Sequence, residues 1–191
     1  MLKRVVVTGM GALTPIGNTL LEYKQSLFEG VSGAAPITRF DASKFKTRFA
    51  CEVKGLEVAQ YIPRQEARKM DLFTQYAVIV GEQAIQDAGL DLQSVNLDRA
   101  GVIWGSGIGG LKTFEEEVLS FGQGDGTPRF NPFFIPKMIA DSASGVLSMR
   151  FGFRGPTYVT VSACASSNNA LIDAFNYIRL GKMDFCLTGG S

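Results

Sequence analysis

The sequence contains no histidine and only three cysteines, and each shortage excludes a class of chemistry. Without histidine, these residues cannot build a Ser-His or Cys-His catalytic pair, or most zinc sites, from their own side chains. The cysteines, Cys51, Cys164 and Cys186, are odd in number and widely spaced, which argues against a disulfide framework and against paired metal ligands. We therefore expect three free thiols and no bound metal.

Long apolar runs and a net charge of one sign are also missing. The N-terminal apolar run is three valines, far too short for a signal-peptide core or a membrane span. The formal net charge of +1 creates no field that would attract nucleic acid or a membrane surface. We expect a cytoplasmic protein that binds neither, and any charged partner must be met by a local patch.

The 191 residues, 46% of them hydrophobic, suit one domain with a sizeable core. Short β-branched runs alternate with helical patterns, which indicates an α/β fold with a mainly parallel sheet. The β-rich runs predict five strands in that sheet, at residues 4–8, 48–53, 100–104, 157–162 and 184–188.

Apolar residues at three- and four-residue steps predict helices between these strands. They lie at residues 20–28 (with Gly30 as the stop), 65–88, 137–151 and 170–178. The third helix carries small residues that permit close packing. Residues 121–132, rich in glycine and proline, predict a long loop of the kind that often has a function.

One glycine-rich motif, GSGIGG at residues 105–110, fits the dinucleotide-binding pattern after a strand and before a helix. That pattern requires an acidic residue at the end of a second strand about twenty residues later. Asp125 instead lies inside the glycine- and proline-rich loop. We therefore disfavour a dinucleotide site and expect no cofactor of this kind.

The segment TYVTVSACASSNNALIDAFNYIRLG runs from a β-branched strand through Cys164 into a helix. This places the thiol at a helix N-terminus, where backbone N–H groups and the helix dipole favour the thiolate. The same N–H groups could bind the oxyanion formed during acyl transfer. The alternative is a small buried cysteine, and we favour that reading for Cys51 and Cys186 because they lie in expected strands.

Six motifs occur in an order that resembles condensing enzymes of the β-ketoacyl-[acyl carrier protein] synthase family, most closely its synthase II branch. They are RVVVTGMGALTPIGN, RKMD, GSGIGG, NPFFIP, FRGPTYVTVSACASS and TGGS. The resemblance implies one half of a duplicated thiolase-like α/β fold with helices on both faces of the sheet. It makes residues 1–191 the N-terminal synthase domain of a fatty acid biosynthetic enzyme that usually forms a homodimer.

The resemblance also implies roles for individual residues. Cys164 would accept the acyl group from acyl carrier protein, and malonyl carrier protein would then supply the second substrate. Ile108 and Phe133 would line the acyl pocket, although ordinary core packing is their alternative. Arg68 and Lys69 would belong to the basic patch that receives the carrier protein, although exposed helix-end charges are common.

The same resemblance predicts what these residues cannot do alone. No cofactor is implied, because the phosphopantetheine arm arrives on the carrier protein. The family's two catalytic histidines, with their lysine and glutamate partners, belong to the second half of the fold. We expect these residues alone not to catalyse condensation. Three possibilities stay open: a piece of a full synthase, an enzyme completed in trans, or a non-catalytic subunit.

Overall fold

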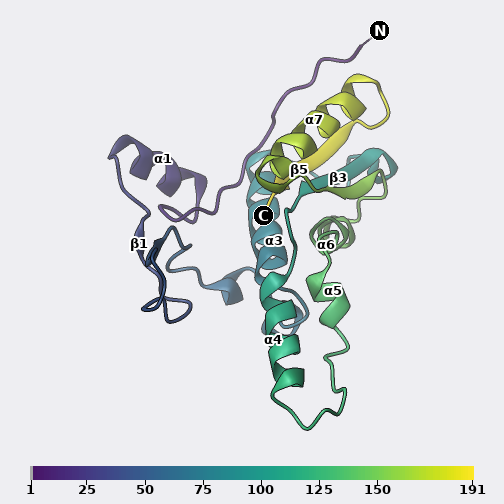
Figure 1. Cartoon of the computed structure of the whole chain (residues 1–191). Helices are drawn as coiled ribbons and strands as arrows, with labels where there is room; N and C mark the ends of the chain where they lie inside the picture. The colour runs from purple at the N-terminus through teal and green to yellow at the C-terminus, as the bar shows by residue number, and fades with distance from the viewer. Residues whose placement is uncertain (1) are drawn as a thin grey trace.

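A computed structural model describes residues 2–191 and has a three-stranded parallel sheet at its centre (Figure 1). The strands are β3 (Ala100–Gly105), β4 (Thr157–Thr160) and β5 (Phe185–Gly190), in the order β4-β3-β5. Parallel neighbours need crossover connections, and helices supply them here. The α/β class predicted from the alternating patterns is confirmed.

Helices cover both faces of this sheet, as the resemblance implied. On one face, α7 (Ser166–Arg179) packs its Ala170 and Ala174 against Ile103. On the other face, α3 (Leu72–Asp87) and α6 (Ser142–Phe151) enclose Val102 and Trp104 in the larger core. Because β3 is buried on both faces, its sequence AGVIWG is apolar throughout instead of alternating.

The prediction of five strands in one sheet is wrong within the described residues. Residues 4–8 are extended but pair with no strand there, and Val6 and Val7 are exposed. Residues 48–53 contain only β2 (Phe49–Ala50), which pairs antiparallel with β1 (Ala35–Pro36) in a separate hairpin. A β-rich run shows a tendency to extend, whereas a strand also needs a partner backbone.

Two predicted helices are each divided. Residues 65–88 form α2 (Arg64–Ala67) and α3, because the Asp71 side chain accepts a hydrogen bond from the Phe73 N–H and begins a new helix. Residues 137–151 form the end of α5 (Phe134–Met138) and then α6. As expected, Ala143 and Ser144 are buried in α6.

Other boundaries agree more closely with the sequence. Helix α1 (Leu20–Phe28) matches its prediction, and Gly30 beyond it has the positive φ of 68° that glycine tolerates. Helix α4 (Leu111–Gly122) runs into the start of the predicted loop. Three short 3₁₀ turns complete the chain, η1 (Val58–Gln60), η2 (Leu97–Arg99) and η3 (Ala163–Ala165).

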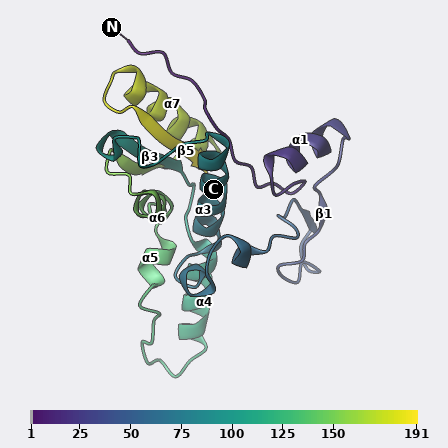
Figure 2. The same ribbon diagram turned by 180° about the vertical axis from the view of Figure 1, so that it is seen from behind.

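Two groups of elements project from the sheet and the helices that cover it. Helix α1 and the β1–β2 hairpin lie to one side of the sheet, and α4 and α5 extend beyond one end of it (Figures 1 and 2). The same views show the N-terminal segment running beside α7, where the Lys3 N–H donates to the Arg179 carbonyl at 2.9 Å. Within residues 2–191, no helix is long and apolar enough to span a membrane.

Candidate functional site

The three parallel strands end together, and this shared edge is the starting point of the candidate site. Gly105, the last residue of β3, lies opposite Thr160 at the end of β4 and opposite Gly190 at the end of β5. In open α/β sheets, ligands bind outside the carboxyl ends of the strands. Cys164 follows β4 by a few residues, at this edge.

The turn that carries Cys164 is strained at the residue before it. Ala163 has a φ of 50° and is the one non-glycine residue with positive φ in the described chain. A left-handed alanine costs about 1–2 kcal/mol, and such strain occurs where the surrounding structure fixes a functional geometry. Cys164 is exposed in η3, immediately before α7, so the predicted strand-to-helix turn is confirmed.

Ser166, buried at the start of α7, holds this turn in place. Its hydroxyl accepts a hydrogen bond from the Ser162 N–H at 2.9 Å and donates one to the Ala163 carbonyl at 2.7 Å. The Thr160 hydroxyl donates to the Ser166 carbonyl at 2.8 Å. These bonds fix the backbone on both sides of Cys164, so its position does not depend on the thiol's own contacts.

Two glycines allow the first turn of α7 to approach the sheet edge. A Cβ on Gly105 would overlap the backbone nitrogen of Ser167, and a Cβ on Gly190 would overlap the Ser167 hydroxyl. The chain end is also tied to this edge, because the Ser191 N–H donates to the Gly105 carbonyl at 3.0 Å. The motifs GSGIGG, ACASS and TGGS therefore meet in space around Cys164.

The remaining glycines of GSGIGG also have protein neighbours. A Cβ on Gly109 would overlap the Met138 carbonyl, and one on Gly110 would overlap the Lys137 carbonyl, both at the end of α5. Gly107 faces Ala163, the residue before Cys164. Close packing accounts for these glycines without a pyrophosphate, although the strand, loop and helix order of a dinucleotide motif is present.

The two residues expected in the acyl pocket are both exposed. Ile108 lies beside Gly107 and has 70% of its surface accessible. Phe133 directly precedes α5, is 40% accessible, and carries the Lys69 ammonium 5.5 Å from its ring centroid. The core-packing alternative is therefore wrong for both residues. Their role in an acyl pocket stays a prediction, because the described contacts do not join either side chain to Cys164.

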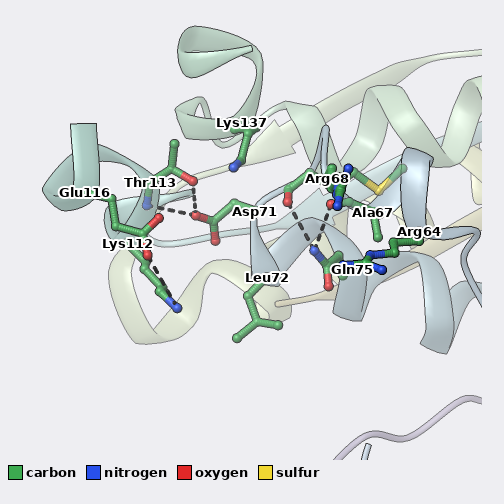
Figure 3. A pocket seen from close by; sticks show the side chains of 11 residues that line it. Arg64, Ala67, Arg68, Asp71, Leu72, Gln75, Lys112, Thr113, Glu116 and Lys137 are labelled. Carbon is green, nitrogen blue, oxygen red and sulfur yellow. Dashed lines mark hydrogen bonds and ion pairs between the residues drawn. The ribbon is translucent and has the colours of Figure 1, made fainter. Parts of the chain in front are cut away.

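Arg68 and Lys69 are adjacent and exposed, but they line different hollows. Arg68 belongs to a pocket of about 390 Å³ between α2, α3, α4 and α5, which Figure 3 shows from close by. Lys69 lies at a more apolar pocket of about 280 Å³ between α3, α5 and α6. Neither pocket is lined by Cys164. The two residues of the predicted basic patch therefore line two separate pockets.

Lys112 and Lys137 also line the Arg68 pocket and were not predicted. They lie on α4 and α5, far from Arg68 in sequence, so only the fold could reveal the cluster. Asp71, on the same pocket, had a sequence signal, since an aspartate before an apolar helical pattern predicts an N-cap.

The other two cysteines behave differently from each other. Burial raises the pKa of the Cys186 thiol to about 12, which fits the predicted structural role in β5. Cys51 lies just beyond β2 and is exposed, so the prediction that it is a buried strand residue is wrong. All three cysteines are free, as their spacing predicted.

Comparisons with a family model and with known sequences point to the same family. The family model described as "Beta-ketoacyl synthase, N-terminal domain" matches residues 2–191. The chain is 48% identical over 189 residues to 3-oxoacyl-[acyl-carrier-protein] synthase 2 of Synechocystis sp., covering 99% of the chain and 45% of that protein. It is 42% identical over 192 residues to the protein of the same name from Staphylococcus aureus (strain COL), with 99% and 45% coverage.

Solved structures agree on the fold. The ishigamide ketosynthase/chain length factor matches with a TM-score of 0.91 and 30% identity, over 100% of this chain and 47% of that one. A ketosynthase bound to a hexaketide, in complex with its type II PKS acyl-carrier protein, matches with a TM-score of 0.85 and 25% identity, over 99% and 50%. The chain thus spans about half the length of the relatives that it matches.

Proposed function

The chain belongs to the β-ketoacyl synthase family, and from this we propose that it supplies the acyl-accepting half of a 3-oxoacyl-[acyl carrier protein] synthase of fatty acid biosynthesis. The observation that carries the proposal is the meeting of three strand ends at the strained turn before Cys164. That geometry presents an exposed thiol beside a helix N-terminus, as acyl transfer requires.

The proposed first step is transfer of an acyl group between two thiols. The Cys164 sulfur attacks the carbonyl carbon of an acyl-pantetheine thioester, and a new C–S bond forms. The resulting oxyanion is stabilised by backbone N–H groups at the start of α7. When the original C–S bond breaks, the pantetheine sulfur leaves and takes the proton that the Cys164 thiol gave up.

The later steps need groups that these residues do not contain. Decarboxylation of malonyl carrier protein develops negative charge on an enolate, which must be neutralised by positive or hydrogen-bond-donating groups. The resemblance assigns this task to two histidines, and the sequence has none. We therefore propose that residues 1–191 capture an acyl group and that the condensing step uses a histidine-bearing half.

The carrier protein and a second copy are the proposed partners. A relative was solved as a ketosynthase in complex with its acyl-carrier protein, which supports a carrier protein as partner. The resemblance, and not that complex, is the reason for proposing Arg68 and Lys69 as the docking residues. Several large apolar side chains of α4 are partly exposed, which is typical of an interface and supports a homodimer. They are Leu111, Phe114, Val118, Leu119 and Phe121. We place the reaction in the cytoplasm and propose no cofactor of the enzyme itself.

An acyl-transfer experiment tests this proposal directly. The protein is incubated with an acyl carrier protein thioester, and intact mass with peptide mapping then locates the adduct. We expect one acyl group on Cys164 and none in the Cys164→Ala variant. Acylation of Cys51 or Cys186 with Cys164 unmodified would contradict the site assignment.

A second measurement separates capture from condensation. Malonyl carrier protein is added to the acylated protein, with and without a polypeptide that corresponds to the second half of the family fold. We expect no 3-oxoacyl product from residues 1–191 alone. A 3-oxoacyl product from residues 1–191 alone would refute the proposal that condensation needs a histidine-bearing half. If the natural full-length polypeptide is acylated but forms no product, a non-catalytic subunit is favoured instead.

A further inference from the structure

The hydroxyl of Ser166 points away from the helix that this residue begins. A serine at an N-cap accepts hydrogen bonds from N–H groups further along its own helix. Helix α7 has Ala165 at its N-cap and no side-chain cap. Ser166 instead bonds backward, accepting from the Ser162 N–H at 2.9 Å and donating to the Ala163 carbonyl at 2.7 Å. Its hydroxyl therefore serves the turn before the helix and not the helix itself.

The burial of Ser166 makes these two bonds hard to replace. Only 3% of its surface is accessible, and a buried hydroxyl is unfavourable unless it is hydrogen-bonded. The position of Ser166 is set by β4, because the Thr160 hydroxyl donates to its carbonyl at 2.8 Å. The sheet thus holds Ser166, and Ser166 holds the segment that carries Cys164.

Ala163 is the residue at which these bonds are needed. Its φ of 50° is left-handed, which disfavours an alanine by a factor of about 5–30 relative to its ordinary conformations. The hydroxyl and the N–H of Ser166 both donate to the Ala163 carbonyl, which fixes the peptide group between Ala163 and Cys164. Since the Ala163 side chain is exposed, its own packing does not impose the left-handed conformation.

A second side-chain bond joins the turn to α7, but it is weaker support. The Asn169 amide donates to the Ser162 hydroxyl at 2.6 Å, in an exposed pair. Water can replace either partner of an exposed pair, whereas loss of the buried Ser166 hydroxyl leaves the Ser162 N–H and the Ala163 carbonyl each without a partner bond. Ser166 is therefore the side chain on which the turn depends most.

We propose that Ser166 is a positioning residue for acyl transfer: its hydroxyl holds Ala163 in the left-handed conformation and thereby aims the Cys164 thiol at the incoming thioester. The inference rests on the proposed function and deepens it. Attack on the thioester carbonyl and capture of the oxyanion need the sulfur and the N–H donors in one fixed arrangement. Without the Ser166 bonds, the alanine relaxes toward negative φ and rotates the backbone that leads to Cys164.

The experiment measures the rate at which an acyl carrier protein thioester acylates Cys164 in the natural polypeptide that contains this chain. Ser166→Ala should lower this rate about 10-fold, because a small displacement of a reacting group is enough for such a loss. Alkylation of the same thiol by iodoacetamide needs exposure but no oriented thioester, so it should change by less than about 2-fold.

Ser144→Ala is the matched control. Ser144 is also a buried serine in the first turn of a helix, and its hydroxyl donates to the carbonyl three residues earlier, that of Asp141, at 2.9 Å. Asp141 has an ordinary helical φ of −71°, so no left-handed residue depends on this bond. Ser144→Ala should leave the acylation rate of Cys164 unchanged.

A glycine substitution tests how Ser166 acts. Glycine adopts positive φ readily, so Ser166→Ala should lower the acylation rate by less than about 3-fold in an Ala163→Gly background. A merely structural role predicts no such rescue, because glycine makes the chain more flexible and adds to the loss. Ala163→Val keeps Ser166 intact. A β-branched residue strongly disfavours positive φ, so this variant should lose about 10-fold or more in acylation rate.

The outcomes separate this inference from the proposed function. If the unaltered polypeptide is acylated on Cys164 and Ser166→Ala reacts at the same rate, the positioning role is refuted while the proposed function stands. If the Ala163→Gly background does not restore the rate, Ser166 acts by another route and the inference is also refuted. If the unaltered polypeptide is not acylated, both fail. Thermal unfolding checks the fold of each variant, and should Ser166→Ala not fold, an unchanged rate in Ala163→Val refutes the role.

Discussion

The buried carboxylate of Asp71 accepts two hydrogen bonds from Thr113, a residue 42 positions further along the chain. Asp71 begins α3, and Thr113 lies in the first turn of α4. One side chain therefore both begins the helix that covers the sheet and positions α4, which forms one wall of the pocket beside Arg68. Loss of this contact should therefore lower the stability of the fold.

Thr113→Val tests this connection. The substitution keeps the shape of the side chain but removes the hydroxyl donor, so the buried Asp71 carboxylate loses a partner. We expect the free energy of unfolding to fall by about 1–3 kcal/mol, measured by urea denaturation. Thr127→Val in the exposed loop after α4 is the control and should change stability by less than about 0.5 kcal/mol. Equal effects of the two variants would show that the Asp71 contact is unimportant.

The three thiols should differ in reactivity. Burial raises the pKa of Cys186 to about 12, so its thiol stays neutral at pH 8, whereas Cys51 and Cys164 are exposed. We expect iodoacetamide at pH 8 to alkylate Cys51 and Cys164 in the native protein and to reach Cys186 only after unfolding. The raised pKa of Cys186 contributes to the stability of the folded state below pH 9.0, the ordinary pKa of the thiol. This stabilisation is lost as the pH rises from 9.0 toward the folded-state pKa of about 12. Rapid native labelling of Cys186 would contradict this assignment.

Gly105→Ala should displace the turn that carries Cys164. The added Cβ would overlap the Ser167 nitrogen, so the first turn of α7 must move and carry Cys164 with it. We expect a loss of about 1–3 kcal/mol in stability and a fall on the order of 10- to 100-fold in the rate of Cys164 acylation.

Gly122→Ala is the matched control for that variant. Gly122 ends α4, and a Cβ there would meet no atom within 4 Å. Because alanine favours the helix over glycine, stability should stay equal or rise by up to about 1 kcal/mol. An unchanged acylation rate in Gly105→Ala would mean that the α7 turn tolerates the shift.

Arg150→Met removes the polar contacts by which one side chain joins α6 to α2, to α3 and to the end of η1. The Arg150 side chain is 22% exposed, pairs with Glu82 and with Glu66, and donates to the Tyr61 carbonyl at 3.2 Å. We expect a loss of about 2 kcal/mol, since two partly buried carboxylates lose their cation. Arg154→Met, which breaks an exposed pair with Asp98, should cost about 1 kcal/mol or less. Chemical denaturation compares the two, and a larger effect at Arg154 would contradict the ranking.

Acid should weaken the attachment of the N-terminal segment. Hydrogen bonds from Arg99 and then Lys3 hold the pKa of Asp184 well below its ordinary value of 3.8. A depressed carboxyl pKa stabilises the folded state above 3.8, and that contribution is lost as the pH falls from there toward the folded value. Asp184→Asn should therefore reduce the decline in stability below pH 4. Unchanged acid sensitivity in this variant would assign the decline to other carboxylates.

The local patterns of the sequence determined much of the site. Apolar periodicity located the helices that flank the sheet, and the β-branched run before Cys164 located the strand-to-helix turn. The ordered motifs identified the family, and the absence of histidine excluded catalytic pairs that need an imidazole from these residues' own side chains. These properties follow from near neighbours or from composition, so no distant contact was needed to see them.

Only the tertiary structure decided which predicted strands paired. Residues 4–8 have the composition of a strand but no partner in the described chain, whereas Gly105, Thr160 and Gly190 meet at one edge. The strain at Ala163 was equally invisible in the sequence, because alanine adopts positive φ only when the surrounding hydrogen bonds impose it. The pocket lined by Arg68, Lys112 and Lys137 forms only because helices far apart in the chain approach one another. A sequence specifies which side chains are available, and the packing of distant elements decides which of them act together.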